Sequence, residues 1–182
     1  IEVVCAFDIN KSKVGKDLSE AIFEEPNNTV KFVEVPNLGI NVKPGKVLDG
    51  IGKFVEDIID PTDDSENIIV DLKDSGAEIL INLLPVGSDE AVKFYADCAI
   101  AANVGFINCI PVFIARDDEW YKKFKDKNVP LIGDDIKSQV GATIVHRVLA
   151  QLFSDRGVNL KRSYQLNVGG NMDFLNMLEE DR

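Results

Sequence analysis

Strands and helices alternate along most of this 182-residue chain, and that alternation limits the fold more than any other feature. Short apolar runs fit buried strands, and the segments between them carry apolar residues at helical spacing. The expected order is a helix at Glu66–Ser75, a strand at Glu78–Leu84, a helix that begins at Ser88, a strand at Gly105–Ile110, a helix at Asp117–Lys125, a strand at Pro130–Ile132 and a helix at Ser138–Phe153. Such alternation predicts an α/β fold with a doubly wound parallel sheet.

The first 65 residues fit this scheme less regularly. Ile1–Phe7 is a near-continuous apolar run that ends at Asp8, which predicts a parallel strand buried on both faces. A helix is expected over Lys11–Phe23, because its apolar residues recur at helical spacing. Glu25–Ser65 holds many prolines and glycines, and we interpret it as an insertion of loops with one short helix near Ile51–Ile59.

The pattern changes after Arg156-Gly157, where an extended segment at Ser163–Val168 follows. We therefore predict a Rossmann-like domain over residues 1–153 and the beginning of a second, α+β domain over residues 154–182. The chain opens directly in an expected strand, without an initiator Met. We expect a piece of a longer protein, with a first domain that is incomplete at its N-terminus and lacks its first βα unit.

Composition narrows the class of ligand. The net charge is -11, and the basic residues are scattered, which disfavours a nucleic-acid surface because phosphate backbones need clustered Lys and Arg. We expect a small-molecule ligand instead. The three cysteines lie in apolar stretches without metal-binding spacing, and no apolar run approaches the roughly 20 residues of a membrane helix. A cytoplasmic protein with reduced thiols and no membrane partner is predicted.

Asp8 closes the first expected strand. In dinucleotide-binding folds an acid at the end of the second strand binds the ribose hydroxyls, and it repels the 2′-phosphate of NADP. Asp8 is therefore a candidate contact for NAD. A strand-terminal Asp is as often only a turn or cap residue, and the glycine-rich G-x-G-x-x-G motif that should precede it is absent from the chain.

Two loops follow later strands at the edge where open parallel sheets bind ligands. Pro85 and Val86 lie in the first loop, and Asn108 and Pro111 lie at the start of the second. All four are predicted to contact the cofactor, because Pro and Gly bring the backbone close to a flat ring. The alternative is that these residues only form ordinary turns and loops, which have the same composition.

The segment from Ile132 to Thr143 is the richest in chemistry. Asp134 and Asp135 follow a strand, and Lys137 and Ser138 precede a helix, so carboxylates, an ammonium group and free backbone N–H groups converge. The combination suits a phosphate or a developing oxyanion. A capped helix with a solvated Lys137 is the alternative.

These residues belong to motifs that resemble inositol-1-phosphate synthase of the bacterial and actinobacterial type. The sequence GDDIKSQVGAT is followed about 20 residues later by QLNVGGNMDFLNM, and FDINKSKVGKDLSEAIF, LDGIGKF, LLPVGSDEAVKFYADCAI and INCIPVFIA are also similar to that family. The resemblance covers essentially the whole chain. It implies that residues 1–153 bind NAD and that residues 154–182 begin a catalytic and oligomerisation domain.

The resemblance also implies the reaction. The family converts D-glucose 6-phosphate to 1D-myo-inositol 3-phosphate, also named L-myo-inositol 1-phosphate. The steps are oxidation at C5, enolisation at C6, aldol closure onto C1 and re-reduction at C5. The reaction has no net redox change, so the enzyme is an isomerase and NAD stays bound through each turnover. A homotetramer is the implied assembly.

Four residues match catalytic positions of the family: Lys137, Asp135, Asn171 and Asp173. Asp134 and Ser138, in the same motif as Lys137, are predicted cofactor contacts. Where the eukaryotic pattern has a second lysine, this chain has Val140-Gly141-Ala142-Thr143, which leaves one catalytic cation unassigned. The lysine-rich stretch that follows GGNMDF in the family lies beyond Arg182. A requirement for a divalent metal ion stays open, because no clean ligand set is visible.

Two other functions fit parts of the pattern. A Rossmann dehydrogenase with net redox chemistry shares the alternation and Asp8, but it does not call for GDDIKSQ followed by LNVGGNMDF. A truncated module that keeps the nucleotide fold as a non-catalytic surface is the second alternative. We expect this chain alone to be inactive.

Overall fold

The computed structural model describes residues 1–27, 30–62, 67–136, 140–170 and 172–179. The chain forms two compact units, one of Ile1–Asp135 with Asn171–Arg182 and the other of Ile136–Gly170. Each unit is considered by itself. The predicted domains, residues 1–153 and 154–182, stay a prediction.

A parallel three-stranded sheet organises the first unit. Strands β3 (Ile79–Asn82), β4 (Gly105–Asn108) and β5 (Leu131–Ile132) are paired in that order. The predicted α/β class with an open parallel sheet is confirmed. Because the strands are parallel, their carboxyl ends meet at one edge, which we call the carboxyl edge.

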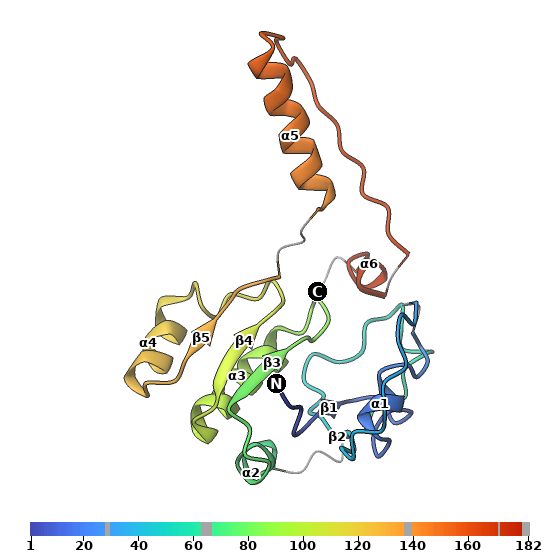
Figure 1. The fold of residues 1–182 in the computed structure, drawn as a ribbon, viewed down its shortest axis with the longest axis vertical. Helices are drawn as coiled ribbons and strands as arrows, with labels where there is room; N and C mark the ends of the chain where they lie inside the picture. The colour runs from blue at the N-terminus through green and yellow to red at the C-terminus, as the bar shows by residue number, and fades with distance from the viewer. Residues whose placement is uncertain (28–29, 63–66, 137–139, 171, 180–182) are drawn as a thin grey trace. The chain divides into compact units, whose positions relative to one another are not determined.

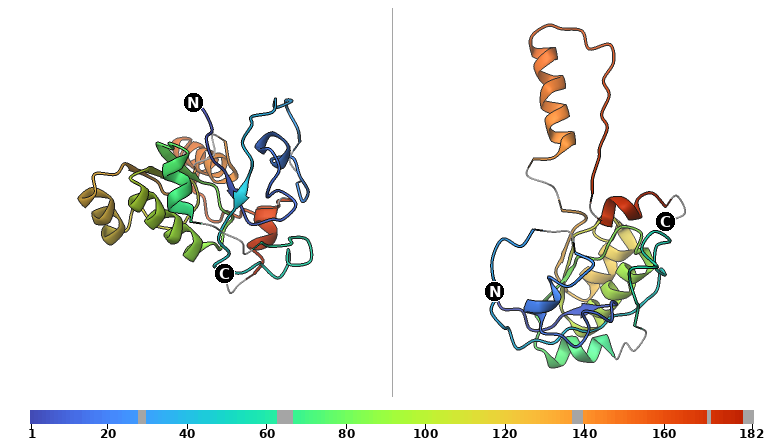
Figure 2. Two further views of the ribbon diagram at one scale, coloured as in Figure 1. Left: turned by 90° about the horizontal axis from the view of Figure 1, so that it is seen from below. Right: turned by 90° about the vertical axis from the view of Figure 1, so that its right-hand side faces the viewer.

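Helices pack on one face of this sheet. The register aligns Leu80, Phe106 and Leu131, so these residues share a face. Helices α2 (Ile68–Asp74), α3 (Asp89–Ala102) and α4 (Asp118–Asp126) contribute to the core on that side (Figures 1 and 2). The opposite face carries Ile79, Ile81 and Ile132, which are 57%, 54% and 63% exposed.

The centre of the core contains large apolar side chains with almost no exposure. The rings of Phe106 and Phe124 stack with centroids 6.1 Å apart, and Leu72, Val92 and Ile114 are buried in the same cluster. Each such side chain contributes about 1.5–3 kcal/mol by leaving water. This cluster holds α2, α3 and α4 against the strands, and it thereby fixes the carboxyl edge.

Side chains cap the N-termini of all three helices, but at α3 the capping side chain is not that of Ser88, where the helix was predicted to begin. Asn67 accepts hydrogen bonds at the start of α2, and Asp117 does so at the start of α4. Ser88 occupies the N-cap position of α3 without a side-chain cap bond. The carboxylate of Asp49 instead accepts from the backbone N–H groups of Glu90 and Ala91, at 2.8 and 2.9 Å.

The N-terminal predictions need correction. Strand β1 covers only Phe7–Asp8, where it pairs in parallel with β2 (Lys43–Pro44), and Ile1, Val3 and Val4 are exposed. The predicted strand Ile1–Phe7, buried on both faces, is therefore wrong. Within the described residues β1 has only β2 beside it, so no second neighbour buries the run.

The predicted helix Lys11–Phe23 shrinks to α1 (Leu18–Ala21). Gly15 adopts φ +85°, which a right-handed helix excludes, and Asp17 then caps the short helix. The expected helix near Ile51–Ile59 is a run of turns, although Val55 is buried there. In these segments the contacts of Asp17 with the later loop decide the conformation, since its carboxylate also accepts from Leu38 and Ile40 N–H.

The remaining helices are α5 (Ala142–Asp155) in the second unit and α6 (Met172–Asn176) in the first. Helix α5 begins later than predicted: Val140 and Gly141 are not helical, and Ser138 lies outside the described residues. No helix in the part of the chain that the structure describes is long and apolar enough to cross a membrane.

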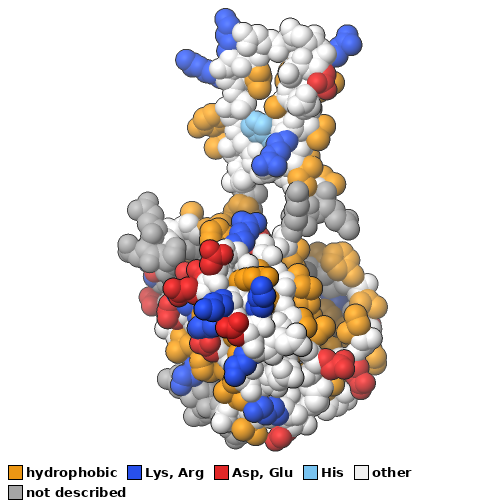
Figure 3. All heavy atoms as spheres, turned by 90° about the vertical axis from the view of Figure 1, so that its left-hand side faces the viewer, with side chains coloured by type: hydrophobic (Ala, Val, Ile, Leu, Met, Phe, Trp, Pro, Cys, Tyr) orange, Lys and Arg blue, Asp and Glu red, His pale blue; other side chains and the backbone are white. Residues whose placement is uncertain are grey.

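Charges are mixed on the face of the first unit that Figure 3 shows. On the face shown in Figure 3, acidic and basic side chains are interspersed with apolar ones. This face carries no single basic patch of the kind that a nucleic-acid backbone requires.

Candidate functional site

A row of buried polar side chains crosses the carboxyl edge. Asn82 ends β3, Asn108 ends β4 and Asp134 follows β5 by two residues. The Asn82 side-chain amide donates to Asn108 Oδ1 at 2.8 Å, and the Asn108 amide donates to Asp134 Oδ1 at 2.9 Å. Their exposures are 5%, 2% and 7%. We call these three residues the edge ladder.

Asp134 accepts four hydrogen bonds. Besides the Asn108 amide, the backbone N–H groups of Ile114, Ala115 and Arg116 donate to its carboxylate, at 3.0, 3.0 and 3.2 Å. A buried carboxylate needs such donors to offset its desolvation. Asp134 thus ties the loop after β4 to the end of β5. Its predicted role as a cofactor contact stays a prediction.

Asn108 also fixes that loop directly. Its amide donates to the carbonyl oxygen of Val112 at 2.6 Å, in addition to the bond to Asp134. Gly133 lies against it, and a Cβ at Gly133 would come within 3.1 Å of Asn108 Cβ and 3.3 Å of the Asn108 carbonyl oxygen. The sequence predicted Asn108 at this edge, but it gave no sign of the contacts with Asn82 and Asp134.

The other predicted site residues that follow strands, and that the structure describes, lie at the same edge. Pro85 and Pro111 are exposed, Val86 is half-buried, and all three follow strand ends. Asp135 is exposed and adopts φ +73°, a left-handed conformation that Asp tolerates better than most residues. These four residues are not part of the edge ladder. Their contacts with a ligand stay predictions.

Two residues that the sequence did not single out also lie in the loop after β4. Phe113 is 60% exposed, and the guanidinium carbon of Arg116 lies 5.4 Å from the centre of its ring. This separation is within the range of a cation–π contact. In the sequence Val112, Phe113 and Ile114 form one continuous apolar run, so no local signal distinguished Phe113.

Asp8 lies at the end of β1, in the other sheet. Its Oδ1 accepts from Asn10 N–H at 2.8 Å, and its Oδ2 lies 3.4 Å from Lys13 Nζ. The carboxylate is one-third exposed. A carboxylate offers about four acceptor positions, so acceptor capacity remains beyond these two contacts for a pair of hydroxyl groups.

Tyr95 of α3 anchors the strand end beside Asp8. Its hydroxyl oxygen accepts from Lys46 N–H at 3.2 Å, and its ring lies 6.3 Å from that of Phe7. Burial raises the pKa of Tyr95 above its ordinary value, so the hydroxyl stays protonated at neutral pH. Gly45 passes directly over it, since a Cβ there would be 2.8 Å from the Tyr95 hydroxyl.

Several predicted site residues cannot be placed. Lys137, Ser138 and Asn171 lie outside the described residues. Asp173 belongs to α6 by its backbone, while its side chain also lies outside the description. Among the described residues, no group of three or more His, Cys, Asp or Glu side chains is arranged to hold a metal ion.

None of the edge-ladder bonds involves a thiol, although Cys109 directly follows Asn108. Cys98 is buried, Cys5 and Cys109 are half-buried, and all three are free. Burial, with a smaller contribution from Asp97, raises the pKa of Cys98 to about 11. Its thiol therefore stays protonated near neutral pH and packs as a small apolar group.

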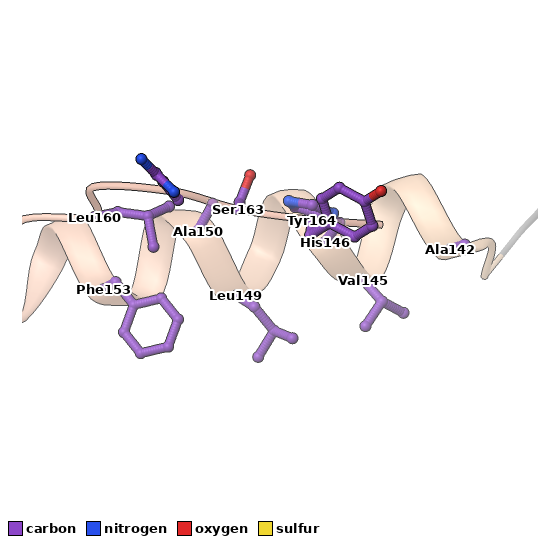
Figure 4. A pocket seen from close by; sticks show the side chains of 10 residues that line it. Ala142, Val145, His146, Leu149, Ala150, Phe153, Leu160, Ser163 and Tyr164 are labelled. Carbon is purple, nitrogen blue, oxygen red and sulfur yellow. The ribbon is translucent and has the colours of Figure 1, made fainter. Parts of the chain in front are cut away.

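The second unit has its own hollow. A cavity of about 520 Å³ lies between α5 and the extended segment that follows it, and Figure 4 shows Val145, Leu149 and Phe153 projecting to one side of the helix. His146 and Tyr164 also line this cavity. None of the predicted site residues is among those that line this cavity.

Comparison with known proteins identifies the family. The family model described as myo-inositol-1-phosphate synthase matches residues 141–182. The whole chain is 58% identical to inositol-3-phosphate synthase of Mycolicibacterium smegmatis, 57% to that of Mycobacterium tuberculosis and 54% to that of Corynebacterium glutamicum. It spans 50% of the length of each of these relatives.

A solved structure gives independent support for the fold. The crystal structure of Ari2 superposes with a TM-score of 0.82 at 41% sequence identity, over 96% of this chain and 50% of that one. Identity above 50% along the entire chain, with a matching fold, confirms the resemblance drawn from the motifs. The chain belongs to the inositol-1-phosphate synthase family.

Proposed function

We propose that the full-length protein converts D-glucose 6-phosphate to 1D-myo-inositol 3-phosphate with NAD as a bound cofactor. The observation that carries the proposal is the 54–58% identity to relatives named inositol-3-phosphate synthase along the whole chain. The carboxyl edge, with buried positioning contacts and exposed loops, is the place where a parallel sheet of this type binds ligands.

Asp8 fits the ribose of NAD. Its carboxylate ends a strand, remains one-third exposed and retains acceptor capacity for two hydroxyls. Its negative charge would disfavour the additional phosphate of NADP. Bound NAD would supply a hydride acceptor and donor for C5 of the sugar. Pro85, Val86 and Pro111 would border the cofactor from the loops of the carboxyl edge.

The residues matched to the family's catalytic positions would handle protons and charge. Lys137 would transfer a proton at an oxygen of the sugar and stabilise negative charge on the enolate. Asp135, Asn171 and Asp173 would orient the substrate beside it. The charge of Lys137 should matter more in the transition state than in the bound substrate, so its effect belongs mainly to kcat.

The proposal extends to the setting of the enzyme. A homotetramer in the cytoplasm is what family membership suggests, and three free cysteines in the chain agree with a reducing compartment. A small phosphorylated sugar is the expected substrate, which the net charge of -11 and the interspersed surface charges favour over a nucleic acid.

The test is a product and cofactor balance. The full-length protein is incubated with glucose 6-phosphate and a small amount of NAD, and both inositol phosphate and NADH are quantified. We expect inositol phosphate in large excess over the NAD supplied, without accumulating NADH. A dehydrogenase with net redox chemistry would instead stop after one equivalent of NADH, and that result would reject the proposal.

A further inference from the structure

The edge ladder ends on a single loop. Three consecutive backbone N–H groups, those of Ile114, Ala115 and Arg116, donate to the two oxygens of Asp134. The Asn108 amide binds Asp134 and also Val112 in the same loop. One buried carboxylate therefore fixes the backbone from 114 to 116, and Asn108 fixes its beginning.

This arrangement determines which side chains the loop presents. Ile114 is fully buried and anchors the loop in the core, so the neighbouring side chains of Phe113 and Arg116 remain exposed. Within the described residues, no carboxylate lies within salt-bridge distance of the Arg116 guanidinium. Its described ring contact is with Phe113. The cation is thus held beside an aromatic ring in a loop of the carboxyl edge, where it is accessible to a ligand.

The chemistry of this pair selects an anion. A guanidinium group offers a planar fork of N–H donors that matches phosphate oxygens. Both ligands of the proposed function, the sugar substrate and the dinucleotide, carry phosphate. We propose that Arg116 contacts a phosphate group of the bound ligands and that Asp134 is the positioning residue that holds Arg116 in place. This assignment rests on the proposed function for the identity of the ligands.

The kinetic test compares Arg116→Gln with Asp134→Asn in the full-length protein. An amide at 134 keeps one acceptor oxygen and turns an NH2 group toward backbone donors, so part of the loop loses its anchor. We expect each variant to raise KM for glucose 6-phosphate, or Kd for NAD, by about 10- to 100-fold, the range for losing a hydrogen bond to a charged group. The ligand that loses affinity shows which phosphate Arg116 contacts.

The double variant separates positioning from general damage. If Asp134 acts through Arg116, Asp134→Asn combined with Arg116→Gln should be no worse than the worse single variant within about twofold. Arg116→Lys should recover part of the affinity, because it keeps the charge. Lys122→Gln removes an exposed cation from α4 as the matched control and should change neither constant. Multiplying effects in the double variant, or unchanged affinities in Arg116→Gln, would overturn the proposal.

A structural readout keeps the test independent of turnover. Hydrogen exchange of peptides that cover residues 112–116 should be faster in Asp134→Asn than in the wild type, while α3 is unchanged. If Asp134→Asn does not fold, Asn82→Ala removes the far bond of the ladder, together with the bond that Asn82 Oδ1 accepts from Leu84 N–H, and should give a smaller increase in the same peptides. Unchanged exchange there would refute the ladder's role even if the wild type makes inositol phosphate. If these peptides exchange faster in Asp134→Asn but the wild type has no synthase activity, the role of the ladder is supported and the proposed function is rejected.

Discussion

Replacing Asn108 by Asp should make the stability of this protein strongly dependent on pH. The Asn108 amide nitrogen lies 2.9 Å from Asp134 Oδ1, and both residues are buried. Asn108→Asp puts a second carboxyl oxygen at that place. At an effective dielectric constant of about 20, two unit charges at this separation repel by about 6 kcal/mol.

The folded variant will avoid that repulsion by keeping a proton on the new pair. An isolated Asp ionises near pH 3.9, so holding one proton costs about 1.4 kcal/mol for each pH unit above that value, or about 4 kcal/mol at pH 7. This is less than the repulsion, so the protonated pair is favoured. The folded state then binds more protons than the unfolded state, and the stability of the variant falls as pH rises.

Urea unfolding at pH 5, 6, 7 and 8 measures this effect. Relative to the wild type, Asn108→Asp should lose about 1.4 kcal/mol more for each pH unit, or about 4 kcal/mol over the range. Asn37→Asp is the control, since Asn37 is exposed and its side-chain oxygen already accepts from Gly39 N–H. It should run parallel to the wild type. A parallel curve for Asn108→Asp would show that the edge ladder is not formed as described.

Four other expectations concern the wider site and the fold. Lys137→Ala should lower kcat for inositol phosphate formation about 100-fold or more with little change in NAD affinity, and near-normal turnover would remove Lys137 from the chemistry. Asp8→Ala should narrow the preference for NAD over NADP in binding assays, whereas equal wild-type affinities would remove its ribose role. Gly133→Ala should cost about 1–3 kcal/mol in urea unfolding, because its Cβ would meet Asn108. Gly170→Ala is the control and should be neutral, because the added Cβ would meet no described atom within 4 Å. Hydrogen bonds from the Ser19 hydroxyl and then from backbone N–H groups hold the pKa of Asp17 well below its usual range. The stability that Asp17 contributes is therefore present above about pH 4 and is lost as the pH falls below it. Asp17→Asn should make the free energy of unfolding less dependent on pH below about pH 4, and the same pH dependence in variant and wild type would contradict this.

The sequence predicted the elements whose information is local. Helices α2 and α4 begin at the Asn67 and Asp117 caps, and β3, β4 and β5 follow from apolar runs bounded by turns. These segments carry their own periodicity and capping residues, so no distant contact was needed to recognise them.

The errors lie where distant contacts decide. Asp49 caps α3 from about 40 residues away, and no local motif announces such a contact. The predicted helix Lys11–Phe23 failed because Gly15 takes a left-handed conformation and Asp17 is bound by a later loop. The spacing of apolar residues reveals neither the left-handed glycine nor the contacts of Asp17 with the later loop.

The candidate site shows the same division. Proline and aspartate directly after the expected strands marked the carboxyl edge, which is where open parallel sheets bind their ligands. The ladder joins residues that are 26 positions apart at each step, from Asn82 to Asn108 and from Asn108 to Asp134. Asparagine at a strand end has many local explanations, so only the fold could show that the three side chains meet.

The fate of the hydrogen at C5 of the sugar tests the central claim most directly. Glucose 6-phosphate labelled with deuterium at C5 is incubated with the full-length protein, NAD and an excess of unlabelled free NADH, and the inositol phosphate is analysed by mass spectrometry. If the protein is a synthase that oxidises and re-reduces the same carbon with a cofactor that stays bound, the product should retain the deuterium. Loss of the label to the free nucleotide, or the absence of inositol phosphate, would contradict the account.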